Sequence, residues 1–218
     1  MQIRVKPNFE GANIEVNDID DCELETTIPP WKLKNPTINF WLCQYKKDCT
    51  NCLAYRQLFL EQCEKYRGFT RIFTDGSKRE ERTAAACVSN LNFARPTQLR
   101  LPNYSSIFTA ELKAIQLALQ EVERSTRRDF LILSDSLSAL KAFESRAISH
   151  PSLGDIHDAH TWLVTKGKRI VFMWIPSHIG IYGNHVVDKA AKEALILEPP
   201  KDIFQFVPFR DLRSRVLL

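Results

Sequence analysis

The chain has 218 residues, of which 44% are hydrophobic and 10% aromatic, enough for one domain with a hydrophobic core plus an appendage. It has no run of about 18 apolar residues and no apolar stretch at its start, so we expect neither a membrane-spanning helix nor a signal peptide. We therefore expect an intracellular protein, cytoplasmic or nuclear, that does not act at a membrane.

The net charge of +4 is unevenly distributed along the chain. Residues 1–27 contain two basic and seven acidic side chains, whereas residues 69–197 contain 17 basic and 13 acidic ones. Four of those 13 acids are assigned below to metal binding, and the remainder of that segment is strongly basic. A basic shell around an acidic pocket favours a polyanionic partner together with divalent cations.

Six cysteines at irregular spacings fit a reduced compartment better than a disulfide scaffold. Cys49 and Cys52, with Cys43 and Cys63 outside them, suggest a zinc site at first sight. Their separations match no standard zinc pattern, and Cys63 falls at helical spacing from Phe59. A structural role for Cys63 in a helix is the favoured interpretation.

Residues 1–68 are predicted to contain an acidic tail, a Pro/Trp-rich connector and an amphipathic helix. The tail, residues 1–27, is poor in aromatic residues and is expected to be poorly ordered. The connector, IPPWKLKNPTINFWL, has three prolines within eight residues, which forbids a regular helix and indicates an extended, docked segment. The helix is predicted over 50–66 and would be capped by Thr50 or Asn51.

From Phe69 to residue 197 the pattern is that of a second, larger unit, followed by a C-terminal extension over 198–218. Apolar alternation and apolar runs predict strands over 69–75, 83–93, 97–101, 130–135 and 169–175. Helices are predicted over 107–124, 136–145, 152–166 and 184–195, with Ser134 or Asp135 placed to cap the second of them. Hairpin-like strands followed by alternating helices and strands predict an α/β fold with a mixed sheet and helices packed on it.

Three acids occupy positions that structure alone would not require. Asp75 ends the first predicted strand, Asp135 ends the apolar strand FLILS, and Glu111 lies at the rim of the apolar stripe of the helix over 107–124. Ligand sites form at the carboxyl ends of strands in such sheets, and clustered carboxylates are unfavourable unless cations neutralise them. Alone, each has an ordinary explanation as a turn residue, a helix cap or a first-turn acid. Together they favour a site for Mg²⁺ or Mn²⁺.

Four sequence blocks make the pattern specific: IFTDGSK, SSIFTAELKAIQLAL, FLILSDSLSALKAF and VFMWIPSHIGIYGNHVVDKAAKEA. Over residues 69–197 the chain resembles the type 1 ribonuclease H domain of non-LTR retrotransposons. The resemblance implies a ribonuclease H-like fold, a five-stranded mixed sheet of order 3-2-1-4-5 with helices on both faces. It also implies a catalytic metal site made of Asp75, Glu111, Asp135 and Asp188, and a catalytic role for His178 in a mobile loop.

The activity implied by the resemblance is hydrolysis of the RNA strand of RNA–DNA hybrids with two Mg²⁺ ions, or Mn²⁺, leaving 5′-phosphate and 3′-hydroxyl ends. The implied partners are the hybrid itself and a reverse transcriptase domain in a longer parent protein. Recognition of a 2′-hydroxyl on one strand requires polar contacts near the site. The candidates for these nucleic-acid contacts are Gly76, Ser77, Asn103, Ser106, Thr109 and Ser136, although serine and asparagine in loops are more often turn formers.

The sequence departs from the family pattern at one block. The family's Gly-Asn-Glu-x-Ala-Asp reads here Gly-Asn-His-Val-Val-Asp, so that His185 replaces an acid near Asp188. One alternative is therefore a decayed retroelement fragment that only binds nucleic acid. A second alternative is a transposase or integrase of the same broad fold, but the Ser-His-Ile-Gly loop followed closely by Asp188 favours ribonuclease H.

Overall fold

The computed structural model describes residues 19–20, 26–46, 49–146, 148–199 and 207–208. The predicted acidic tail and the C-terminal extension lie almost entirely outside these ranges. Within them, β1 (Ile19–Asp20) and β8 (Val207–Pro208) form a separate two-stranded parallel sheet.

Six strands of the described chain form the main sheet, in the order β2-β7-β6-β3-β4-β5. Their bounds are Thr37–Asn39 for β2, Thr70–Arg79 for β3, Arg82–Ser89 for β4, Thr97–Arg100 for β5, Asp129–Ser134 for β6 and Arg169–Trp174 for β7. The pairs β3–β4 and β4–β5 are antiparallel, whereas β3–β6, β6–β7 and β7–β2 are parallel. The sheet is therefore mixed, with a hairpin half and a parallel half that meet at β3.

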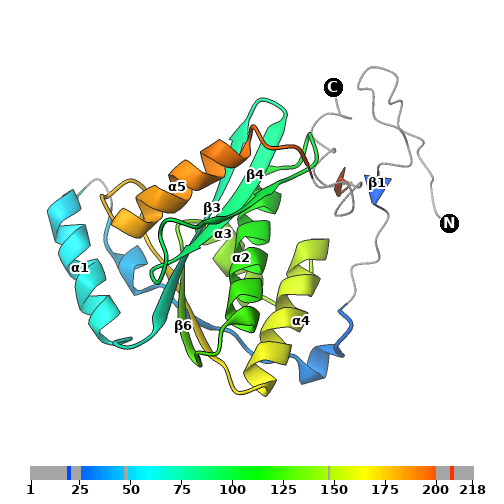
Figure 1. Cartoon of the computed structure of the whole chain (residues 1–218). Helices are drawn as coiled ribbons and strands as arrows, with labels where there is room; N and C mark the ends of the chain where they lie inside the picture. Colours follow the sequence, from blue (N-terminus) through cyan, green and yellow to red (C-terminus); the bar gives the residue numbers. More distant parts are fainter. Residues whose placement is uncertain (1–18, 21–25, 47–48, 147, 200–206, 209–218) are drawn as a thin grey trace.

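Helices cover both faces of this sheet (Figure 1). One face carries α2 (Ile107–Arg124), α3 (Leu137–Glu144) and α4 (Pro151–Thr165). The other carries α1 (Cys52–Glu64), α5 (Tyr182–Ala194) and the 3-10 turn η3 (Trp41–Gln44); a further 3-10 turn, η2 (Pro30–Lys32), precedes β2. The α/β fold with helices on both faces is thus confirmed.

The central strands alternate between two hydrophobic cores. In β6, Phe130 and Ile132 pack toward α2, α3 and α4, while Leu131 and Leu133 pack toward α1 and α5. All four side chains are at most 1% exposed. A strand covered on both faces has no polar side, which explains why residues 130–133 form a continuous apolar run.

The sheet has one strand more than predicted. The five strands β5-β4-β3-β6-β7 occur in the predicted order 3-2-1-4-5, and the sixth, β2, comes from the connector and pairs with β7. The prediction of five strands missed it because Thr37–Asn39 follow the last of three closely spaced prolines and show no strand pattern of their own. An extended segment can nevertheless pair with the free backbone groups of an edge strand.

Hydrogen bonds fasten the start of the connector to α4. The carboxylate of Asp158 accepts from Thr27 N and Oγ1, both at 2.7 Å, and from Ile28 N at 3.2 Å. Lys34 N donates to Thr161 Oγ1 at 3.0 Å. Residues 27–39 therefore bind along α4 and β7, while the division of the chain at residue 68 remains a prediction.

Some element ends differ from those predicted. β3 continues beyond Asp75 to Arg79, because it pairs with β4 up to a tight hairpin at Glu80, whose φ is 56°. Ser136 caps α3 by accepting from Ala139 N at 3.4 Å, in place of the predicted Ser134 or Asp135. Asn51 caps α1, as one of the two predicted candidates, by accepting from Ala54 N at 2.7 Å.

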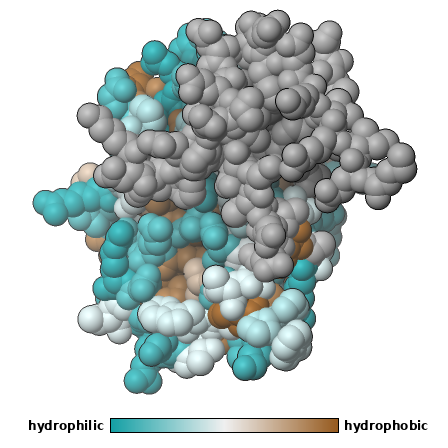
Figure 2. Space-filling model, turned by 90° about the vertical axis from the view of Figure 1, so that its right-hand side faces the viewer, coloured by the Kyte–Doolittle hydropathy of each residue, from teal (hydrophilic) through white to brown (hydrophobic). Residues whose placement is uncertain are grey.

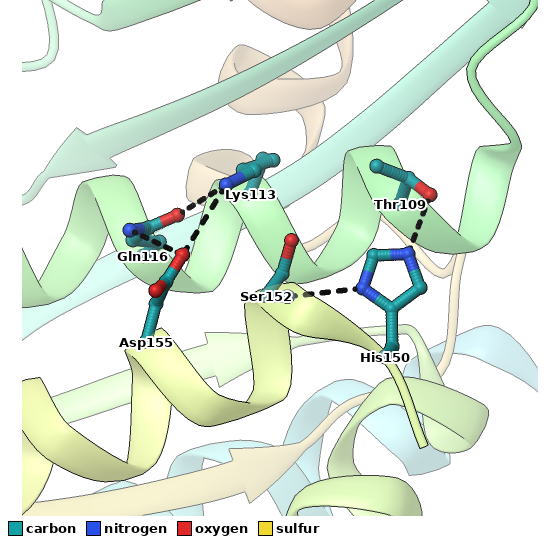
Figure 3. Close-up of polar contacts among 6 residues, drawn as sticks. All are labelled: Thr109, Lys113, Gln116, His150, Ser152 and Asp155. Carbon is teal, nitrogen blue, oxygen red and sulfur yellow. Dashed lines mark hydrogen bonds and ion pairs between the residues drawn. The ribbon is translucent and has the colours of Figure 1, made fainter. Parts of the chain in front are cut away.

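A seam of polar contacts joins α2 to α4 (Figure 3). His150 caps α4, because its Nδ1 accepts a hydrogen bond from Ser152 N at 3.1 Å. The ring proton is therefore on Nε2, which lies 3.0 Å from Thr109 Oγ1. One turn further along α2, the buried Lys113 pairs with Asp155 at 3.6 Å. These contacts fix the rotation of α2 about its own axis. They therefore direct the opposite side of α2 toward β3.

Figure 2 views the molecule from the side on which α4 lies, and hydrophobic patches interrupt a mainly hydrophilic surface there. Trp162 of α4 is 46% exposed. None of the helices in the described part of the chain is both long and apolar enough to cross a membrane.

Acid should destabilise the protein through a buried histidine of α4. His160 packs against the rings of Phe143 and Phe172 and is 1% exposed. Burial, and after it the neighbouring His157, lowers the pKa of His160 from 6.5 to about 4. As the pH falls, the histidine is therefore protonated in the unfolded chain before it is protonated in the folded protein. Its contribution to stability is lost between pH 6.5 and about pH 4. The contribution of His160 to the free energy of unfolding should fall by about 2 kcal/mol between about pH 7.5 and about pH 5.

Urea denaturation at the two pH values measures the free energy of unfolding of the wild type and of the matched control His160→Leu. The difference between their pH dependences is the contribution of His160. Contributions from the carboxylates are common to both proteins and cancel in the difference. A wild-type pH dependence equal to that of His160→Leu would show that His160 is not its source.

Candidate active site

Three predicted metal ligands meet at one point of the sheet. Asp75 lies on β3, Glu111 on α2 and Asp135 directly after β6, and one carboxylate oxygen from each lies within 4.8 Å of the others. β3 and β6 pair in parallel up to Thr74 and Ser134. The next residue of each strand is therefore an aspartate, and the parallel register itself places the two carboxylates side by side.

Glycine at position 76 allows Glu111 to join them. A Cβ added to Gly76 would lie 2.9 Å from Ala110 Cβ and 2.9 Å from Glu111 N, closer than side-chain carbons approach. The absence of a side chain thus lets the first turn of α2 rest on the β3 backbone. The Gly76 backbone also hydrogen-bonds to the carboxylates of Asp75 and Glu111.

The electrostatics of this cluster are those of carboxylates with too little counter-charge, because Lys192 offsets the effects of burial and of the neighbouring acids on Asp75 only in part. Burial, followed by the charges of Asp135 and Asp188, raises the pKa of Asp75 to about 8. Burial and then Asp75 and Asp135 raise the pKa of Glu111. The pKa of Asp135 is also raised, chiefly by burial. A bound cation would reverse these shifts, because it supplies the missing positive charge.

The residues present fit a divalent metal ion. All three ligands are hard oxygen donors, which Mg²⁺ and Mn²⁺ prefer. Moreover, Glu111 Oε2 is buried and has no hydrogen-bond partner within the described chain. A buried carboxylate oxygen without a partner is costly, and coordination of a cation would satisfy it.

Asp188, the fourth predicted ligand, lies beside this group and not within it. Its charge acts on Asp75 and on Asp135, but its Oδ2 accepts from Lys192 Nζ at 2.7 Å, one turn further along α5. Lys192 was not anticipated from the sequence, although an i, i+4 pair of opposite charges is a recognisable signal.

The position of α5 depends on a second close contact. A Cβ on Gly183 would lie only 2.2 Å from Cε2 of Phe73 on β3, so the helix can reach the sheet there only with glycine. The next residue, Asn184, is 6% exposed and donates from Nδ2 to Asp135 Oδ2 at 3.2 Å. Asn184 therefore orients a predicted metal ligand, a role that sequence reasoning missed even though the Gly-Asn pair stood in the block.

His178 lies on the loop between β7 and α5. It is exposed and has a φ of 59°, a left-handed conformation that residues other than glycine rarely adopt. It lines a cavity of about 560 Å³ together with Asn184, His185 and Asp188. The loop thus brings the predicted catalytic histidine to the cavity that Asp188 lines, and α5 brings His185, which departs from the family pattern, to the same cavity.

The predicted nucleic-acid contacts have structural partners as well. Ser106 caps α2 through Thr109 N, and Ser136 caps α3. Thr109 is buried beside His150, and Asn103 Oδ1 accepts from Arg100 at 2.5 Å. Contact of these residues with a substrate remains a prediction.

A comparison with known protein families shows to which family this chain belongs. The profile of the RNase H family matches residues 68–196, a range that includes all four acids and His178. The chain belongs to the RNase H family. The match begins after β2 and α1, so these two elements lie outside the matched range and pack against it in this RNase H chain.

Residues of the chain are also similar to a retroviral protein. The Pol polyprotein of equine infectious anemia virus (strain Wyoming) is 29% identical over 126 residues, which is 56% of this chain and 10% of the polyprotein. The chain thus spans about a tenth of the length of this curated relative. The predicted resemblance to RNase H domains of retroelement polyproteins is confirmed.

Proposed function

We propose that the protein is an endonuclease that hydrolyses the RNA strand of RNA–DNA hybrids with divalent cations. The observation that carries the proposal is the group of buried Asp75 with half-buried Glu111 and Asp135, whose oxygens lie within 4.8 Å of one another, in a chain of the RNase H family.

The roles of the residues follow from their positions. Asp75, Glu111 and Asp135 would hold Mg²⁺ or Mn²⁺, with Asp188 completing the ligand set after release from Lys192. Such cations activate water and stabilise the charge that develops on the departing 3′ oxygen. Asn184 orients Asp135, and His178, in its exposed loop, takes up or delivers a proton near the leaving group. The products would carry 5′-phosphate and 3′-hydroxyl ends.

A second candidate function, binding of nucleic acid without cleavage, is favoured by two observations. His185 stands where the family pattern has an acid, and Lys192 neutralises Asp188. His185 and Lys192 are basic side chains near Asp188, whereas negative charge at this position strengthens the binding of a metal ion.

Cleavage of an end-labelled RNA–DNA hybrid separates the two functions. The protein should cut the RNA strand of the hybrid in Mg²⁺ or Mn²⁺, leave duplex RNA and duplex DNA intact, and lose this activity in EDTA. A folded protein that binds the hybrid but cuts it with neither metal would establish the second function and refute the first.

Replacement of His178 should slow cleavage without abolishing it. We expect His178→Ala to lower the rate constant of the cleavage step by about 10- to 100-fold, because one proton-transfer group is lost while the carboxylates remain. Single-turnover cleavage measures this change. Since alanine tolerates the left-handed backbone poorly, His178→Asn, which tolerates it better, is the control. Activity of His178→Asn equal to that of the wild type would rule out a role for the imidazole.

A further inference from the structure

Arg56 of α1 extends over the loop that carries His178. A Cβ on Gly180 of this loop would lie 3.6 Å from Arg56 Cδ and 4.0 Å from Nη1, and Figure 1 shows α1 alongside the segment that leads into α5. The Arg56 side chain makes no hydrogen bond or ion pair with any residue that the structure describes. A guanidinium placed beside the candidate site without a carboxylate partner is free to bind an anion.

Arg56 stands where two cavities adjoin. The cavity of about 560 Å³ contains Asp188 and His178, and a second cavity of about 360 Å³ extends from it toward β3. The residues that line both are Arg56, Gly180, Ile181 and Tyr182. We call the two cavities together the α1 groove. The α1 groove leads away from the carboxylates and passes under α1.

The second cavity combines positive charge with aromatic rings. Arg56 and Arg71 line it, and no acidic residue of the described chain does. Tyr182 is 66% exposed, and its ring is supported edge-on by Phe93 at 5.1 Å between centroids. Arginines that track a backbone and exposed rings on which bases stack are the features of sites for single-stranded nucleic acid.

The start of α5 adds to the positive potential of the α1 groove. Ile181 is the N-cap of this helix, and its side chain accepts no hydrogen bond from the first turn. The first-turn N–H groups therefore have no side-chain cap, and Ile181 and Tyr182, at the positive end of the helix dipole, line the groove. This supports the anion preference already set by the two arginines.

We propose that the α1 groove binds a single-stranded continuation of the strand that is cut, with a phosphate on Arg56 and a base stacked on Tyr182. A duplex does not fit this chemistry, because its base faces are hidden. The proposal rests on the proposed function, since the strand reaches the groove from the carboxylates. It assigns to α1, which precedes the family match, a part in substrate choice: hybrids with RNA overhangs are preferred over blunt ones.

Fluorescence anisotropy in the Asp75→Asn background tests the proposal without cleavage. Labelled hybrids are compared that are blunt or carry an RNA overhang of about six nucleotides at one end or the other. The overhang at one of the two ends should tighten binding by about 10-fold. Arg56→Ala and Tyr182→Ala should each reduce this gain to about 2-fold or less. Arg56→Ala should also lower the slope of log affinity against log salt by about one.

Arg67→Ala is the matched control, because Arg67 is exposed beyond the C-terminal end of α1 and lines neither cavity. This variant should keep the full increase in affinity for hybrids with an overhang over blunt hybrids. Equal affinity of Asp75→Asn for blunt and overhanging hybrids, or an unchanged gain in Arg56→Ala, would overturn the proposal. Thermal unfolding confirms that each variant is folded, and Arg56→Lys, which keeps the charge, should retain part of the gain. Cleavage of a blunt hybrid by the wild type is scored separately, so failure of the nuclease proposal is distinguishable.

Discussion

Asp75→Asn should abolish cleavage while making the metal-free protein more stable. The substitution keeps the shape of the side chain but removes the carboxylate charge that lies next to the other carboxylates of the cluster. We expect kcat to fall by on the order of 10³-fold or more, because both water activation and stabilisation of the leaving oxygen depend on the bound cations. The opposite effects on activity and stability distinguish a ligand from a residue that merely supports the fold.

The raised pKa of Asp75 explains why Asp75→Asn should be more stable than the wild type when no metal is bound. Since the folded-state pKa of Asp75 is about 8 and its ordinary value is 3.8, the unsubstituted protein loses stability as the pH rises through that interval. Near pH 8 the variant should exceed the wild type by about 1–3 kcal/mol in EDTA. Mg²⁺ should raise the melting temperature of the wild type but not that of the variant. A variant less stable than the wild type in EDTA, or one that Mg²⁺ stabilises equally, would contradict the assignment of Asp75 as a ligand.

Gly183→Ala should damage stability and activity together. The new methyl group would lie 2.2 Å from the Phe73 ring, so α5 must move outward or the ring must leave its packed position. Overpacking of this kind costs about 1–3 kcal/mol, and we expect the upper part of this range because Phe73 is 4% exposed. The shift also displaces Asn184 and Asp188, so activity should fall by on the order of 10²-fold.

A compensating substitution tests this explanation. Phe73→Leu removes the ring that the methyl group would strike, and the double variant Gly183→Ala/Phe73→Leu should be more stable than the sum of the single effects predicts. Urea unfolding of the four proteins measures the coupling, and hybrid cleavage shows whether activity recovers with it. Strict additivity of the two changes would mean that the contact between α5 and Phe73 is not the cause.

The main elements could be predicted because their signals are local. The apolar run 130–133 and the helical period of residues 107–124 each reside within one segment, and Asp75 and Asp135 occur at the ends of recognisable patterns. The meeting of Asp75 and Asp135 was expected from the rule that ligand sites lie at the carboxyl ends of strands, and that of Glu111 from its place at the rim of the apolar stripe of residues 107–124. For this reason the three-carboxylate group could be derived from residues far apart in the chain.

What could not be predicted depends on contacts between distant segments. The pairing of Thr37–Asn39 with Val171–Met173 leaves no periodic trace in three residues. Asn184 gains its role only when α5 is placed beside Asp135, and Arg56 only when α1 is placed beside Gly180. Lys192 is an exception, because its spacing from Asp188 was visible in the sequence.

The strand β2 also determines how the protein can be divided. A fragment that starts at residue 68, where the family match begins, would lack both β2 and α1. Its β7 would become an edge with unpaired N–H and C=O groups, and the apolar surface that Tyr55, Phe59 and Cys63 cover would face water. Exposed edges of this kind pair with other copies, so such a fragment would self-associate. We therefore expect the smallest soluble unit to begin near Thr27, some forty residues before the start of the family match.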